Sequence, residues 1–346
     1  MNELKQLRFP AIYSQLASDF LAGVPLMQRL NTPLTRVFEL LRIPLATLDD
    51  PHATLNGKQV EMLLAAGNMI ADKSERFSVQ LCRQFREDTL GLLGLALVNS
   101  ANGGEALKTF QKYIFLYSPG IDFHFHQDQT HLEVTLRPLV RFDRTVENIL
   151  FEIIFCAVGF YMQRAGITLT PEYHLPYSIG EHKDEFETFT RGVLLENTSE
   201  AKVRFPIEAL ETPLARPNLA TYKLYIEQLD KQAEAARASE SFSLKARRYI
   251  EHQAQQGRFI SRDDLAEHMA VSVRTLNRKL KDDGLSFQPL LDQARFAIAR
   301  RLLIDSDKTT KQIAYEVGIQ NPAVFCRAFK KWSGKTPGDF RDRFRR

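Results

Sequence analysis

Three side chains that can hydrogen-bond to the edges of DNA bases lie close together near the C-terminus. Arg274, Asn277 and Arg278 share one outward arc if their segment is an α-helix. Arginine can bind O6 and N7 of guanine with two hydrogen bonds, and asparagine can bind N6 and N7 of adenine in the same way. Lys279 and Lys281 can neutralise phosphates, which positions a helix without specifying a sequence. The pattern predicts sequence-specific DNA contact, with Arg278 as the leading base-contacting residue.

An amphipathic helix must hold these side chains. Leu276 and Leu280 are four residues apart and predict a buried side opposite the basic one. Ser272 suits the N-cap position, so we expect the helix to run from about Val273 to Lys281.

The same arrangement occurs twice. In each copy a small-residue helix and a tight turn precede a second helix that is apolar on one side and basic on the other, which is the helix-turn-helix pattern. The first halves align at an offset of about 48 residues and the second halves at about 49, so the second turn is one residue longer. The paired segments are Leu265-Ala266 with Ile313-Ala314, Met269–Ser272 with Val317–Ile319, and Leu276–Lys281 with Phe325–Lys330. Two motifs predict a reader of two groove segments, roughly one helical turn (~34 Å) apart.

The second reading helix is less polar than the first. Its candidate contact residues are Asn321, Ala323, Arg327 and Lys330. Pro322 suits the first helical position, where its missing N–H costs nothing. Ala323 can touch a DNA base only through its methyl group, for example at thymine. We therefore expect the second half-site to be read more loosely than the first.

An amphipathic helix over 290–304 separates the two copies, and we expect it to fix the distance and angle between them. Its apolar side carries Phe296, Ala299 and Leu303, and its basic side carries Arg295, Arg300 and Arg301.

Charge divides the chain. Residues 242–346 contain 22 Lys and Arg against 12 Asp and Glu, whereas the remainder contains 24 against 30. A basic segment on an acidic body is expected when one domain meets phosphates and the other does not. The total of 346 residues allows two or three domains.

Compartment signals favour the cytoplasm. The N-terminus lacks the apolar core of a secretion signal. The most apolar stretch, 149–162, contains Glu152 and is shorter than the ~20 residues that span a bilayer, so we expect a buried helix and no membrane partner. Cys82, Cys156 and Cys326 show neither disulfide nor metal spacing, which fits a reducing compartment.

The N-terminal part mixes helical and strand patterns, which predicts an α+β fold. Helices are expected over 34–41, over 60–67 with Asn56 as cap, from Thr89 to Val98, and over 106–116. A β-hairpin is expected over 121–125 and 132–136, where apolar and polar residues alternate. A long helix over 145–165 and short strands over 173–179 and 201–205 follow.

These patterns divide the chain into an α+β domain over 1–217, a linker helix over 218–241 and an all-α domain over 242–346. The linker helix places Leu219, Tyr222, Ile226 and Leu229 at spacings of three and four. This spacing is compatible with two arrangements: packing on its own domain before a flexible linker, or dimerisation through a short coiled coil.

Residues 242–344 resemble the DNA-binding domain of the AraC/XylS family of bacterial transcription regulators, with Ile319 where the family usually has Phe. The matching residues are Leu265-Ala266, Ser272, Arg274-Thr275-Leu276, Arg278, Gly284-Leu285-Ser286-Phe287, Arg295, Ala299-Arg300-Arg301-Leu302-Leu303, Ile313-Ala314, Val317-Gly318, Phe325, Arg327-Ala328-Phe329-Lys330, Gly334, Thr336-Pro337 and Arg341.

The N-terminal part is similar to the arabinose-binding-like effector domain of one AraC-type subfamily, whose ligands are chemically diverse. The matching segments are Ile43 with Leu48–Pro51, Gly91–Gly94, Glu105–Leu107 with Tyr113, Glu152 with Phe160 and Arg164, and Val203–Phe205.

Together the resemblances imply a cytoplasmic regulator, usually an activator, that binds double-stranded promoter DNA, contacts RNA polymerase, responds to a small-molecule effector and can form a homodimer. The residues that would contact DNA are Arg274, Thr275, Asn277, Arg278, Lys281, Asn321, Ala323, Arg327 and Lys330.

Aromatic side chains of the N-terminal part are candidates for an effector pocket. They are Phe110, Phe115, Phe151, Phe155, Phe160 and Tyr161, with Arg164 or Arg137 as a partner for a carboxylate. Such a lining favours an acyl-chain or aromatic acid over a sugar. Ordinary core packing is the competing interpretation.

Other chemistry is less well supported. His124, His126 and His131, with Asp122 and Asp128, can be arranged for a metal, but the solvent-facing side of the hairpin is the favoured interpretation. We expect neither a metal nor another cofactor. Cys156 is expected to pack as a small hydrophobe, whereas oxidation of Cys326, on the second reading helix, would oppose DNA binding.

Two alternatives to an effector-controlled regulator remain. The N-terminal domain can serve only for dimerisation, or it can be an enzyme fused to the DNA reader. No phosphate-binding loop, nucleophile elbow or activated cysteine motif supports catalysis, so we expect no enzyme.

Overall fold

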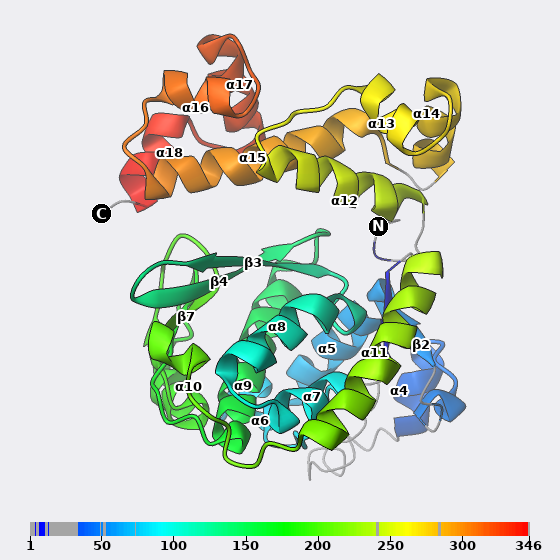
Figure 1. Ribbon diagram of the computed structural model, residues 1–346, viewed down its shortest axis with the longest axis vertical. Helices are drawn as coiled ribbons and strands as arrows, with labels where there is room; N and C mark the ends of the chain where they lie inside the picture. The colour runs from blue at the N-terminus through cyan, green and yellow to red at the C-terminus, as the bar shows by residue number, and fades with distance from the viewer. Residues whose placement is uncertain are drawn as a thin grey trace. The chain divides into compact units, whose positions relative to one another are not determined.

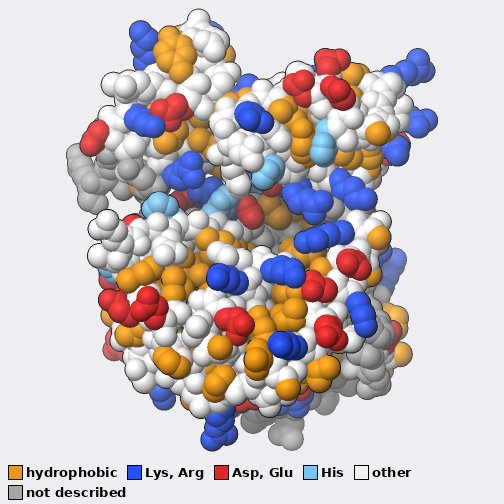
Figure 2. All heavy atoms as spheres, in the orientation of Figure 1, with side chains coloured by type: hydrophobic (Ala, Val, Ile, Leu, Met, Phe, Trp, Pro, Cys, Tyr) orange, Lys and Arg blue, Asp and Glu red, His pale blue; other side chains and the backbone are white. Residues whose placement is uncertain are grey.

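The computed structural model describes residues 4, 7–10, 13, 34–48, 50, 53–72, 74–239, 242–282 and 285–344. They form two compact units divided between Arg237 and Ala238 (Figure 1). Charged side chains of both signs are scattered over the visible face of the N-terminal unit, with hydrophobic side chains between them (Figure 2). Asp49, Pro51 and Gly284, which carry part of the resemblance, and the linker end at 240–241 lie outside the described residues.

A five-stranded mixed sheet forms one layer of the N-terminal unit, in the order β3-β4-β7-β5-β6. β5 and β6 pair in parallel and the other neighbours are antiparallel. The strands are β3 (Ile121–Gln127), β4 (His131–Pro138), β5 (Glu172–His174), β6 (Val193–Leu195) and β7 (Lys202–Pro206). β1 (Arg8–Pro10) and β2 (Thr54–Asn56) form a separate antiparallel pair.

The predicted hairpin is confirmed, with Phe123 opposite Leu136. Asp128 forms its turn, because the carboxylate accepts hydrogen bonds from the backbone N–H groups of Thr130 and His131. These bonds lower the pKa of Asp128 to about 2. The strand predicted over 173–179 is shorter, because Pro176 follows β5 and has no N–H to donate to the ladder.

The predicted helices of the N-terminal unit are all present, although some bounds differ by two or three residues, and the helices Phe77–Cys82 and Lys183–Thr190 were not predicted. Asn56 caps the second predicted helix through a capping box with Gln59. The next apolar helix begins at Gly91 and not at Thr89, whose hydroxyl instead accepts the N–H of Arg86. The bounds are α4 (Leu34–Leu40), α5 (Gly57–Ile70), α6 (Phe77–Cys82), α7 (Gly91–Asn99), α8 (Gly103–Tyr113), α9 (Arg144–Ala165), α10 (Lys183–Thr190) and α11 (Leu219–Ser239), with 3₁₀ turns η1 (Leu45–Leu48), η2 (Ile114–Leu116), η3 (Gly180–His182) and η4 (Ile207–Leu210).

The long helix α9 lies in the centre of the N-terminal core. Phe155 and Cys156 on it are fully buried, and the Phe155 ring lies 5.1 Å from that of Tyr173 on β5. Of the helices in the described ranges, α9 alone is long and apolar enough to cross a membrane. However, 56% of its apolar window is buried inside the unit, as in a core helix.

Helix α11 packs on its own unit. Leu229 and Ala233 are buried in a second cluster with residues of α7 and α8. The Tyr222 hydroxyl lies 2.8 Å from the Thr109 hydroxyl on α8, and the Tyr113 hydroxyl donates to Asp230 at 2.8 Å. This is the first of the two arrangements that the linker spacing allows.

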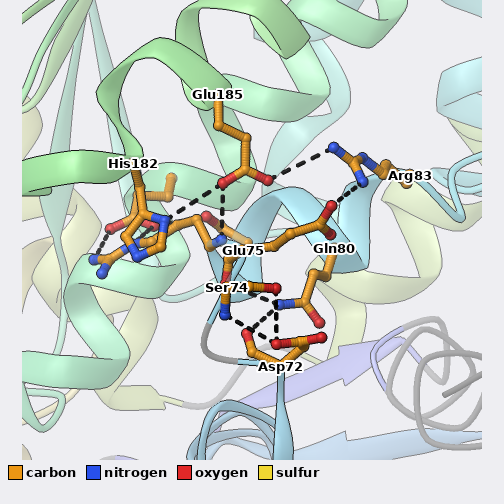
Figure 3. Close-up of polar contacts among 10 residues, drawn as sticks. Asp72, Ser74, Glu75, Gln80, Arg83, His182 and Glu185 are labelled. Atoms are coloured by element: carbon orange, nitrogen blue, oxygen red, sulfur yellow. Dashed lines mark hydrogen bonds and ion pairs between the residues drawn. The ribbon is translucent and has the colours of Figure 1, made fainter. Parts of the chain in front are cut away.

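A buried ionic cluster joins the start of α6 to α9. The Glu152 carboxylate is fully buried and accepts hydrogen bonds from Arg76 Nε at 2.9 Å, Arg76 Nη2 at 2.7 Å and Ser78 Oγ at 2.6 Å. This hydrogen bonding to Glu152 raises the pKa of Arg76. Glu185 on α10 extends the cluster by accepting the Arg76 backbone N–H and pairing with Arg83 at 3.6 Å (Figure 3).

Replacing Arg76 with alanine should destabilise the N-terminal unit by about 3–5 kcal/mol, because the Glu152 charge would stay buried without its partner. The matched change Arg83→Ala removes an exposed ion pair with Glu75 and the longer contact with Glu185 but leaves the Glu152 pair intact, and it should cost about 0–1 kcal/mol. Hydrogen exchange of the α6 and α9 amides along a urea series measures both. Equal losses of unfolding free energy in the two variants would contradict the conclusion that the buried Arg76–Glu152 pair stabilises the unit.

The C-terminal unit is all-helical. Its helices are α12 (Phe242–Gln255), α13 (Arg262–His268), α14 (Val273–Asp282), α15 (Phe287–Asp305), α16 (Thr310–Glu316), α17 (Pro322–Ser333) and α18 (Pro337–Phe344). In Figure 1, α15 runs along the unit, with α13 and α14 at one end and α16 and α17 at the other.

The C-terminal unit has two hydrophobic cores rather than one. The first includes Leu276, Leu280 and Leu290, and the second includes Leu303, Phe325 and Phe329. Helix α15 contributes its first half to one core and its second half to the other, so the predicted spacer is a structural part of both.

Candidate nucleic-acid interface and ligand cavity

Helices α13 and α14 are joined by a tight turn. Ser261 caps α13 through a capping box with Asp264, and these hydrogen bonds lower the pKa of Asp264. The turn is closed by the Val271 N–H, which donates to the Ala266 carbonyl at 3.0 Å. Ala270 within it has φ +51, the left-handed region.

The pair α16 and α17 repeats this frame. Thr309 forms a capping box with Gln312, and the Ile319 N–H donates to the Ala314 carbonyl at 2.8 Å. Gly318 occupies the left-handed position that Ala270 occupies in the first pair, with φ +72. The repeat read from the sequence is therefore also a repeat of backbone geometry.

The two left-handed positions should differ in their tolerance of a side chain. A Cβ at Gly318 would lie 2.8 Å from the Phe259 ring, so Gly318→Ala adds a clash to backbone strain and should cost about 2–4 kcal/mol. Ala270→Gly relieves strain and should change stability by less than about 1 kcal/mol, in the stabilising direction.

The single tryptophan, Trp332, packs 6.1 Å from Phe296 in the second core, so its fluorescence reports unfolding there. A Gly318→Ala protein as stable as the native chain in urea would refute the steric argument. Far-UV circular dichroism provides the companion readout for Ala270→Gly.

Helix α14 presents the predicted polar side chains outward. Leu276 and Leu280 are fully buried, as expected, and Arg274, Asn277, Arg278 and Lys281 are exposed. The expected N-cap is confirmed: Ser272 Oγ accepts the Thr275 N–H at 3.2 Å. The Thr275 hydroxyl lies 3.0 Å from the same Ser272 oxygen, so it is engaged within the helix start.

Helix α17 presents a smaller polar surface. Arg327, Lys330 and Ala323 are exposed, while Phe325 and Phe329 are fully buried. Asn321 caps this helix, because its Oδ1 accepts the backbone N–H groups of Ala323 and Val324. Its carboxamide oxygen is thus committed to the helix, a role that residue type alone did not assign.

Positive charge gathers on the two second helices. Lys and Arg side chains project from the C-terminal unit where Figure 1 labels α14 and α17 (Figure 2). Acidic side chains lie instead on α13, where Asp263, Asp264 and Glu267 are exposed. Because anionic phosphates are attracted to the basic helices and repelled by α13, this distribution favours docking through α14 and α17.

Arg295 has a role that the helical pattern did not predict. From α15 its Nε donates to the Val317 carbonyl at 3.1 Å, and its guanidinium lies 5.5 Å from the centre of the Phe259 ring. Burial lowers the pKa of this arginine. Arg295 thus ties the spacer helix to the second turn, whereas Arg301 on the same helix is exposed.

Arg295→Met should destabilise the second core by about 1–3 kcal/mol, since the buried Val317 carbonyl loses a charged donor. Arg301→Met is the matched control and should change stability by less than about 0.5 kcal/mol. Trp332 fluorescence in urea measures both, and indistinguishable midpoints would show that the tie contributes nothing.

A cavity of about 210 Å³ lies within the N-terminal unit, between α7, α8, α9 and the apolar face of the sheet. Of the candidate effector residues, Phe110 and Tyr161 line it, but the other six do not. Phe151 and Phe155 are core residues, Phe115 lies against the Arg237 guanidinium, and Arg164 is exposed over the Phe160 ring. Apolarity alone did not indicate which side of a largely buried helix faces the cavity.

Two of the three hairpin histidines, His124 and His131, have partners within the protein. His124 Nε2 lies 2.6 Å from Asp122, and the His131 ring lies 3.1 Å from Arg204. Within the described ranges no three His, Cys, Asp or Glu side chains are grouped to hold a metal ion. Cys156 packs in the core as expected, and Cys326 is half-buried.

Comparison with known proteins defines the class as transcription regulators. Residues 33–214 match the arabinose-binding domain of AraC transcription regulators, and residues 265–343 match a helix-turn-helix domain. The chain therefore belongs to the AraC family of DNA-binding transcription regulators.

Individual relatives are distant. The ornithine utilization regulator of Pseudomonas aeruginosa is 25% identical over 343 residues, which cover 96% of each chain. The urease operon transcriptional activator of Escherichia coli is 35% identical over 79 residues, or 23% of this chain and 27% of that protein. The crystal structure of the regulator CdpR from Pseudomonas aeruginosa is 20% identical, with a TM-score of 0.43, and the match covers 92% of this chain and 98% of that one.

Proposed function

We propose that this protein is a transcription activator that binds promoter DNA through two helix-turn-helix motifs and is controlled by a small molecule bound in its N-terminal domain. The repeated frame carries the proposal: two helix pairs, whose turns share a left-handed residue and the same closing hydrogen bond, each expose a basic second helix. Such a helix fits the major groove.

The first motif supplies most of the base recognition. Arg278, Arg274 and Asn277 contact base edges, and Lys281 contacts phosphate. Thr275 stays at the helix start, where Ser272 holds it. In the second motif Arg327 and Lys330 contact DNA, Ala323 approaches a base by its methyl group, and Asn321 retains only its amide NH₂ for DNA.

The proposed division of labour follows the chain. Residues 1–217 sense the effector and support dimerisation, 218–241 link, and 242–346 bind DNA and contact RNA polymerase in the cytoplasm. Helix α8 supports effector control, because its two sides have different neighbours. Ala106 and Phe110 line the cavity, whereas Thr109 and Tyr113 bond to α11, which leads to the DNA-binding unit.

A ligand controls DNA binding only if it binds two arrangements of the protein with different affinity. A ligand that shifts α8 would also displace or break the hydrogen bonds that join α8 to Tyr222 and Asp230 on α11. Helix α8 thus contacts both the cavity and the linker helix α11.

Arg278→Ala should lower affinity about 5- to 150-fold at sites with the preferred base and relax preference at that position, since a bidentate contact contributes about 1–3 kcal/mol. Lys281→Ala should weaken all sequences similarly and reduce the salt slope by about one. Selection from randomised duplexes by the full-length chain at fixed salt measures both, and the first half-site should carry more information.

Uniform weakening by Arg278→Ala, without a change in base preference, would show that this arginine contacts phosphate. Equal information at both half-sites would contradict the weaker role of α17. Failure of the native chain to enrich any sequence would overturn the proposal itself.

A further inference from the structure

The cavity in the N-terminal unit is lined almost wholly by hydrocarbon. Its walls are formed by three helices and the sheet. Examples are Leu97 on α7, Phe110 on α8 and Ile154 on α9, with Val134 and Val203 on the sheet. Among the described residues its lining includes no Asp, Glu, Lys, Arg or His side chain. A charged ligand would therefore lose its hydration without gaining a counter-ion, at a cost of several kcal/mol.

Most of the hydroxyl groups around the cavity are already bonded within the protein. Tyr161 accepts the Leu90 N–H at 3.1 Å and donates to the Glu87 carbonyl at 3.2 Å. Thr89 accepts the Arg86 N–H at 2.7 Å.

The remaining three hydroxyls belong to Tyr13, Tyr117 and Ser118. Tyr13 bonds to Ser118, and burial raises the pKa of Tyr13 to about 12. Burial raises the pKa of Tyr117 as well. All five hydroxyls stay neutral and four of them are engaged within the protein, so a sugar placed here would leave several of its own hydroxyls unsatisfied.

We propose that this cavity binds a small, uncharged, largely hydrocarbon molecule, and not a sugar of the kind the family's domain is described by. The inference rests on the proposed effector control for its regulatory meaning, but not for the binding itself. Its volume exceeds the roughly 150 Å³ of an engineered apolar cavity that binds benzene, so one ring with a short alkyl substituent, or an alkyl chain of similar bulk, fits.

Calorimetric titration of the full-length protein with n-butylbenzene, 1-octanol and L-arabinose tests the ligand class. Both apolar probes should bind and raise the unfolding temperature, and arabinose should do neither. Ala157→Leu places extra carbon in the cavity from α9 and should weaken apolar binding at least about tenfold. Ala106→Leu repeats the test from α8, and exposed Ala235→Leu on α11 is the matched control.

Binding of arabinose in preference to the apolar probes, or binding of no probe, would overturn the proposal. So would apolar binding that both cavity-filling variants leave unchanged while circular dichroism shows them folded. Measuring DNA affinity with and without n-butylbenzene distinguishes ligand binding in the cavity from control of DNA binding by that ligand. An apolar probe that binds the cavity but leaves DNA affinity unchanged would support the ligand class and refute effector control.

Discussion

The burial of one helix in two hydrophobic cores is the constraint on which the C-terminal unit depends. Helix α15 contributes Leu290 to the core beneath α14 and Leu303 to the core beneath α17. Neither core can form without it, so the two exposed basic helices are attached to one rigid element rather than to a flexible connection. Arg295 strengthens this attachment at the second turn by bonding the Val317 carbonyl. The relative placement of α14 and α17 is thus fixed by the packing of both helices on α15.

In the N-terminal unit, too, a single helix packs against two different neighbours. Helix α8 separates an apolar cavity from helix α11, with Phe110 on the cavity side and Tyr113 on the other. The centre of the same unit is held by the Arg76–Glu152 pair, which is buried and bidentate. A bidentate ionic pair in one part of the unit and an apolar cavity in another give the unit unequal resistance to deformation. Local rearrangement is easiest where few directional bonds must break.

Features that depend on neighbouring residues were readable from the sequence. The caps at Asn56 and Ser272, the buried pair Leu276 and Leu280, and the β3–β4 hairpin all follow from spacing within one element. Features that depend on distant segments were not. Strand β6 is three residues long and exists through its pairing with β5, and Arg295 looks like any surface arginine on a helix. Most of the cavity walls were missed for the same reason, since hydrophobicity identifies a buried side chain but not what lies beside it.

Because α15 is one continuous helix, it constrains the spacing between the two DNA half-sites. Each base pair inserted between two half-sites moves the second by ~3.4 Å and rotates it by roughly 35° around the duplex, because the double helix turns once in about 10–10.5 base pairs. A protein with a jointed connection can follow such a change, but one built on a single helix cannot bend or twist to do so at low cost. Promoters served by this protein should therefore drift in base sequence more freely than in spacer length.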